Sequence, residues 1–66
     1  MSVAKIIELT SRSNSSFDDA IRQGIQKAGE TITNVEGAWV KDQQVVIDGN
    51  DIVGYQVSLK ITFIVE

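Results

Sequence analysis

The sequence predicts an α+β fold with the element order β-α-β-β, in which a three-stranded antiparallel sheet is wrapped around one helix. Two observations carry this prediction. A stripe of apolar residues recurs at three- and four-residue intervals in the first half of the chain, and alternating apolar residues flank an Asp-Gly turn in the second half. The chain has 66 residues, which we interpret as a single domain spanning residues 1–66 with no room for a second core.

The first strand is expected over residues 3–9. Apolar residues occur there on both parities, as in a strand that is covered on both faces. Residues 10–16 are rich in serine and polar side chains, so they are predicted to form a loop.

The helix is expected to begin after Ser16, which is a suitable N-cap, with Asp19 in the position of the capping-box acid. About four turns follow, ending between Gly29 and Asn34. Gly24 lies on the apolar stripe although it lowers helix propensity by about 1 kcal/mol, which indicates that a strand approaches closely there. The stripe consists of Phe17, Ala20, Ile21, Gly24, Ile25, Ala28 and Ile32.

Two strands complete the fold. The middle strand is expected over residues 35–47, followed by the turn at residues 48–51 and a last strand that alternates clearly from Tyr55 to Val65. Strict alternation in the middle strand separates two sets of residues. One face then carries Gly37, Trp39, Lys41, Gln43, Val45 and Ile47, and the other carries Ala38, Val40 and Val46.

The strands are too long for one helix to cover. The helix spans roughly 22 Å at 1.5 Å per residue, whereas a strand of about 13 residues reaches over 40 Å. No cysteine is present to form a disulfide, and a chain of this size is marginally stable alone. We therefore expect apolar side chains such as Trp39 to be covered by further copies of the chain.

Composition excludes several classes of function. Without cysteine or histidine there is no zinc finger and no Cys/His nucleophilic site. A net charge of −3 and a pI near 4.7 disfavour nucleic acids and anionic membranes as partners. Neither a secretory signal nor a long apolar span is recognisable, so a cytoplasmic protein is expected.

Acidic residues do not suggest catalysis or a metal site. Asp18 and Asp19 are adjacent in the predicted helix and point about 100° apart, so they do not converge on one bond. The oxygen-bearing residues of the turn, Asp48, Asn50 and Asp51, have the chemistry of an ordinary hairpin and lack the spacing of an EF-hand. We expect a protein that is not an enzyme and has no metal site of its own.

The order of residues resembles the dodecins, small β-α-β-β proteins whose twelve copies form a hollow shell that binds flavins. The resemblance covers essentially the whole chain. It rests on the helix start at Ser16-Phe17, the helix exit at residues 33–35, and the last strand, in which Gly54-Tyr55-Gln56 precedes alternating apolar residues that end at Phe63.

The resemblance implies a homododecamer that stores a flavin, FMN or riboflavin. Gln56 matches the family's glutamine that hydrogen-bonds the flavin edge, although it also suits a polar sheet face. The family's stacking tryptophan falls on Gly37, and the chain's only tryptophan, Trp39, lies two residues later. Trp39 therefore stacks on the ligand or packs at a subunit interface. The alternative is a shell without flavin that has a structural role or holds another ligand or a cation.

Overall fold

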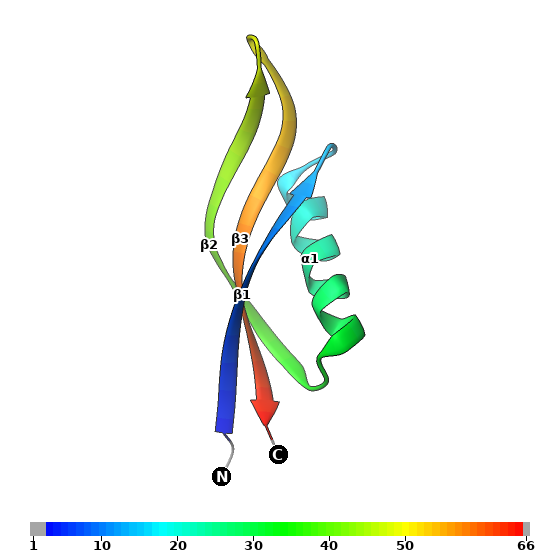
Figure 1. The fold of residues 1–66 in the computed structure, drawn as a ribbon, viewed down its shortest axis with the longest axis vertical. Helices are drawn as coiled ribbons and strands as arrows, with labels where there is room; N and C mark the ends of the chain where they lie inside the picture. Colours follow the sequence, from blue (N-terminus) through cyan, green and yellow to red (C-terminus); the bar gives the residue numbers. More distant parts are fainter. Residues whose placement is uncertain (1–2, 66) are drawn as a thin grey trace.

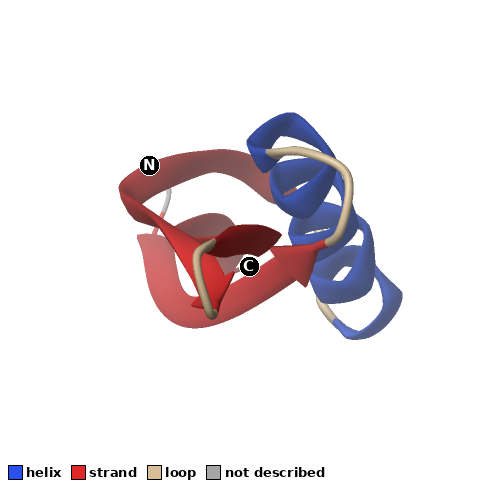
Figure 2. Ribbon diagram, turned by 90° about the horizontal axis from the view of Figure 1, so that it is seen from above, coloured by secondary structure: helices blue, strands red, loops and turns tan. Residues whose placement is uncertain are grey.

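The computed structural model describes residues 3–65 and confirms the order β-α-β-β. Strand β1 (Val3–Ser13) leads to helix α1 (Phe17–Thr31), which is followed by strands β2 (Val35–Asp48) and β3 (Asp51–Val65). The strands form one antiparallel sheet in the order β1-β3-β2, so the last strand lies at its centre. The sheet is strongly twisted, and α1 lies against one side of it (Figures 1 and 2).

Strand β1 is longer than the sequence indicated. The prediction of a loop from residue 10 is wrong, because Thr10 to Ser13 continue the strand and pair with Ser58 to Tyr55 of β3. The long central strand offers backbone partners to this polar segment, and the pairing outweighs the low β-propensity of serine. The expected cover on both faces is also absent from the single chain, in which Ile6 is 60% exposed.

Helix α1 begins where its capping residues predicted. The Ser16 side chain accepts a hydrogen bond from the backbone N–H of Asp19 at 3.0 Å. The Asp19 carboxylate accepts hydrogen bonds from the Ser13 hydroxyl and the Gln23 side chain, each at 2.5 Å. Asn34 follows the helix with a left-handed φ of 62°, which asparagine tolerates better than most residues.

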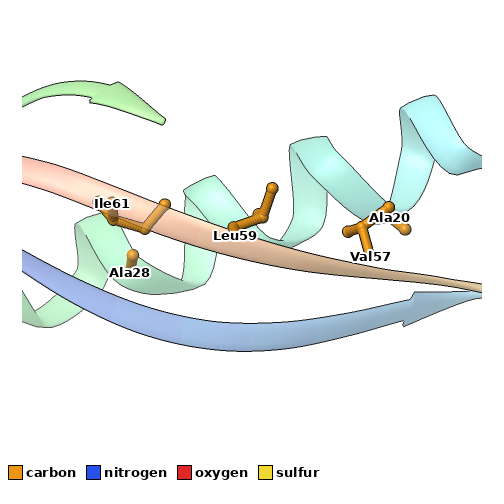
Figure 3. Close-up of a cluster of buried hydrophobic side chains, with 5 residues drawn as sticks. All are labelled: Ala20, Ala28, Val57, Leu59 and Ile61. Atoms are coloured by element: carbon orange, nitrogen blue, oxygen red, sulfur yellow. The ribbon is translucent and has the colours of Figure 1, made fainter. Parts of the chain in front are cut away.

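The core lies between α1 and the central strand (Figure 3). It consists of Ala20 and Ala28 from the helix and of Val57, Leu59 and Ile61 from β3. The close approach predicted at Gly24 is confirmed, because a Cβ atom there would lie 2.9 Å from Leu59 Cδ1 and 3.1 Å from Ser11 Cβ.

Strand β2 departs from strict alternation. Its register against β3 shifts between Val35 and Gly37, between Val40 and Asp42, and between Val46 and Ile47. The extra residue at Lys41 reverses the faces after it, as β-bulges do. Gly37 and Trp39 share a face as predicted, but the assignment of Gln43, Val45 and Ile47 to that face is wrong. Val46 lies on the face of Trp39 instead, since it pairs with Gly54.

The β2–β3 hairpin extends well beyond the N-terminal start of α1 (Figure 1). Gly49 occupies the first of its two loop positions with a φ of 65°, where a type II′ turn requires glycine. Towards this end of the molecule Ile47 is 60% exposed and Ile52 is 56% exposed. Among the described residues, no helix is long and apolar enough to cross a membrane.

Candidate ligand-binding face

The sheet has one face that α1 does not cover, here called the open face. Its residues follow from the strand register, because paired residues in neighbouring strands point to the same side. They alternate with the core residues of β3, which face the helix. The open face carries Ile6, Glu8, Thr10 and Arg12 of β1, Gly54, Gln56, Ser58, Lys60 and Thr62 of β3, and Gly37, Trp39, Asp42, Gln44 and Val46 of β2.

Gln56 lies at the centre of a row of polar side chains that crosses all three strands. Arg12 Nε donates a hydrogen bond to Gln56 Oε1 at 2.6 Å. Gln56 Nε2 in turn donates to Gln44 Oε1 at 3.5 Å, a long contact at the limit of hydrogen bonding. The predicted ligand-binding glutamine is thus half-buried, and both ends of its amide have neighbours.

Trp39 lies on the same face, and the pair formed by Asp42 and Ser58 separates it from the Gln56 row. It is 66% exposed and pairs with Lys60, whose Nζ lies 5.3 Å from the centre of the indole ring. This is the distance of a cation–π contact. Gly37 is exposed beyond Trp39, and a Cβ atom added there would meet nothing within 4 Å.

The three predicted site residues share a face but do not form one pocket in a single chain. Trp39 pairs with Lys60, four positions along β3 from Gln56, which corresponds to about 13 Å. Gly37 pairs with Thr62, which is two positions farther. A ligand that contacts both Gln56 and Trp39 must bridge this interval or receive one of the two side chains from another protomer.

The charges on the open face are arranged across the sheet. Lys41 extends from the bulge in β2 over the central strand to Glu8 on β1, and Nζ and Oε1 lie 3.0 Å apart. The hydrogen bond and the charge of Lys41 lower the pKa of Glu8, and the same pair raises the pKa of Lys41. Lys41 is therefore paired within the chain.

Neither of two hollows in the described chain is lined by Gln56, Trp39 or Gly37, although Arg12 lines one of them. One hollow, of about 380 Å³, lies between the helix exit at residues 31–34 and residues 63–65 of β3. Another, of about 350 Å³, lies between residues 9–12 of β1 and the middle of α1. The described residues contain no group of three or more acidic side chains placed to hold a metal ion. Asp18 is exposed, and Asp19 is occupied by its helix-start contacts.

Two residues of the Gln56 row were not predicted from the sequence. Arg12 fell in the segment interpreted as a loop, and Gln44 was not assigned to the open face because the bulge at Lys41 was not recognised. No local signal marks the continuation of the first strand, because residues 10–16 are all polar.

Comparisons with known proteins identify the family of the chain. The sequence profile of the family described as Dodecin matches residues 3–66. The calcium dodecin of Mycobacterium tuberculosis is 27% identical over 63 residues, covering 96% of this chain and 89% of that protein.

Two solved structures are similar over almost their full length. The dodecin from Streptomyces davaonensis has a TM-score of 0.92 and 25% identity, covering 98% of this chain and 96% of that one. A tryptophan-to-phenylalanine mutant of the Thermus thermophilus dodecin has a TM-score of 0.93 and 27% identity, covering 100% and 98%.

Proposed function

Since this chain belongs to the dodecin family of small ligand-binding proteins, we propose that it is a non-catalytic homododecamer that sequesters a flavin, FMN or riboflavin, on its open face. The cytoplasm is the proposed compartment. The sequence contains neither histidine nor cysteine, so the open face offers no imidazole or thiol for nucleophilic catalysis, which favours storage over turnover.

The observation that supports this proposal most strongly is that the exposed indole ring of Trp39 shares a face with the Gln56 amide, which is hydrogen-bonded by Arg12. Trp39 presents two thirds of its surface to solvent, and an indole face favours stacking with a planar aromatic ligand. Gln56 offers hydrogen bonds to the polar edge of such a ligand. Further protomers would enclose what one chain leaves open.

Fluorescence titration tests whether the protein binds a flavin. Riboflavin and FMN are added in separate series, and flavin emission is expected to fall because stacking on indole quenches it. Trp39→Ala should weaken binding about 10- to 100-fold, the value of one stacking contact. Gln56→Ala should weaken it about 3- to 10-fold.

Gln26→Ala is the matched control, because Gln26 is an exposed glutamine on α1. It should bind flavin like the wild type. Unchanged flavin emission at tens of micromolar ligand contradicts the flavin proposal, and equal affinity in Gln56→Ala removes that residue from the site.

A second candidate function is favoured by Gly37 and by the calcium dodecin among the relatives. Without a ring at Gly37 the shell would hold a cation or another ligand, or would serve as a structural shell. Calcium takes six to eight oxygen ligands. Since residues 3–65 contain no ready cluster of acids, a calcium site would need ligands from more than one protomer.

Calorimetric titration of metal-stripped protein with calcium tests this candidate. Asp42 is the exposed acid of the open face without a lysine contact of the kind that Glu8 makes, so Asp42→Asn should reduce calcium affinity. Asp18→Asn, on the exposed side of α1, is the control. Absence of heat with calcium contradicts the calcium form of this proposal.

A further inference from the structure

The orientation of the Gln56 side-chain amide follows from the chemistry of its partner, Arg12. An arginine side chain has five N–H donors and no acceptor, so the amide atom that it contacts has to be the carbonyl oxygen. Arg12 and Gln56 are paired residues of neighbouring antiparallel strands, which brings their side chains together on the open face. The 2.6 Å separation is that of a strong, charge-assisted hydrogen bond.

Fixing the oxygen also fixes the nitrogen. With Oε1 on the side of β1, the NH₂ group of Gln56 is directed toward β2, where Gln44 Oε1 lies 3.5 Å away. A second lone pair remains on Gln56 Oε1, but the carbonyl as a whole is turned away from the strand that carries Trp39. Toward β2, Gln56 therefore offers donors.

Arg12 is available for this task because its charge is not used elsewhere. The ion pairs among the described residues are Lys27 with Glu30 and Lys41 with Glu8. Arg12 is exposed at the end of β1, and its polar contact within the described part of the chain is the Gln56 carbonyl. Nothing else in the row could hold the amide in this orientation as firmly, since Gln44 contacts it only at long range.

We propose that Arg12 is a positioning residue that orients the Gln56 amide, so that Gln56 donates to an acceptor atom of the bound flavin instead of accepting from its imide N–H. This inference rests on the proposed function and specifies which hydrogen bond the site makes with its ligand. It also predicts a specificity: a ring carbonyl or ring nitrogen is required opposite Gln56, and the N3 hydrogen of the flavin is not.

Riboflavin and N3-methylriboflavin, which lacks the imide N–H, distinguish the two modes. The wild type is expected to bind both within about threefold of each other. In Arg12→Ala the amide is free to rotate and accept from the imide N–H, so riboflavin should be preferred by about 3- to 10-fold more than in the wild type. The same ratio in the wild type and in Arg12→Ala overturns the inference.

Three further variants separate positioning from simple loss of charge. Arg22→Ala removes an exposed arginine from α1 and should keep the wild-type ratio. Arg12→Lys keeps a hydrogen-bond donor, so its ratio of riboflavin to N3-methylriboflavin affinity should stay close to that of the wild type. In the double variant Arg12→Ala/Gln56→Ala the new preference should disappear, and a preference that persists there originates elsewhere and overturns the inference.

Crystal structures without flavin separate this inference from the proposed function. In the wild type, Gln56 should lie within hydrogen-bond distance of Arg12 Nε, and in Arg12→Ala its amide should turn or become disordered. If Arg12 points away from Gln56 in the wild type, the inference is wrong even if flavin binds. If the emission of riboflavin and FMN is unchanged by the protein but the contact between Arg12 and Gln56 is found, the proposed flavin function fails. The orienting role of Arg12 then stands.

Discussion

Gly24 shows how a single missing side chain sets the distance between α1 and the sheet. A methyl group there would lie 2.9 Å from Leu59 Cδ1 and 3.1 Å from Ser11 Cβ, below normal contact distances. Gly29 lies in the same helix, and a methyl group there would meet nothing within 4 Å. Substitution by alanine should therefore have opposite effects on stability at the two glycines.

We expect Gly24→Ala to destabilise the protein by about 1 kcal/mol, because overpacking costs roughly 1–3 kcal/mol and helix propensity returns about 1 kcal/mol. Gly29→Ala should stabilise it by up to about 1 kcal/mol. Denaturant unfolding at one fixed protomer concentration measures both. Equal stabilisation by both substitutions would show that the sheet does not constrain Gly24.

The Glu8–Lys41 pair predicts a dependence of stability on pH. The pKa of Glu8 is lowered from 4.5, so its contribution is complete above 4.5 and is lost as the pH falls through the lowered pKa. The pKa of Lys41 is raised from 10.5, so its contribution persists below 10.5 and is lost above the raised pKa. The pair therefore stabilises the protein across the whole neutral range.

Glu8→Gln should lower the thermal midpoint slightly at pH 7, and the difference should shrink as the pH falls through the lowered pKa of Glu8. The effect should shrink in high salt, because both side chains are about half exposed. Glu30→Gln, which breaks the exposed pair with Lys27, is the control. A difference at pH 7 that does not shrink in acid would exclude the ion pair as its cause.

For single residues, the structural role could be predicted from the sequence in some cases and not in others, for physical reasons. The close approach at Gly24 was predictable because a glycine in the apolar stripe of a helix weakens the helix and is typical of a position where a neighbouring element leaves no space for a side chain. Arg12 was not predictable, because its serine-rich neighbours have loop propensity, and only pairing with the distant β3 makes them a strand. Assigning Gln44 to the open face depended on the bulge at Lys41, which no local pattern marks.

Among the elements, the connection from β1 to α1 depends on one buried hydroxyl. Ser13 is 6% exposed, and its Oγ donates to Asp19 while accepting from the backbone N–H of Ser15 at 2.9 Å. A weaker contact of 3.4 Å comes from the N–H of Ser16, the helix N-cap. The same side chain thus ends the strand and supports the start of the helix.

Ser13→Ala should destabilise the protein by about 1–3 kcal/mol, because the part-buried hydrogen bonds of Oγ to Asp19 and to the N–H of Ser15 are lost. Ser15→Ala is the control, since it changes an exposed side chain and keeps the backbone N–H. Denaturant unfolding measures both, and amide hydrogen exchange should show faster exchange in the first turn of α1 only in Ser13→Ala. Equal stability of the two variants would contradict this role for Ser13.

The element order, the helix start and the hairpin turn were predictable because each depends on local chemistry: an N-cap, an apolar stripe and a glycine with positive φ. The ends and faces of the strands were not, because they depend on which partner β3 supplies. The strand order β1-β3-β2 follows from the same pairing and has no local signal.

For the whole molecule, the balance of covered and uncovered apolar surface favours assembly. The buried apolar side chains of the described chain are Ala20, Ala28, Val57, Leu59 and Ile61, a small core for a chain of 66 residues. Larger apolar side chains remain exposed at the hairpin end and on the open face, including Ile47 at 60% and Ile6 at 60%. Folding and association should therefore be coupled.

We expect the thermal midpoint to rise with protomer concentration and native mass spectrometry to give twelve times 7.2 kDa, about 86 kDa. Placing charges at the end of the hairpin with Ile47→Lys/Ile52→Lys should shift the mass toward smaller species, because an unpaired charge buried in an interface costs several kcal/mol. Gln26→Lys on α1 is the control and should keep the full mass. A stably folded wild-type monomer in dilute solution would show that the exposed apolar residues need no partner, and the open face would then be an ordinary solvated surface.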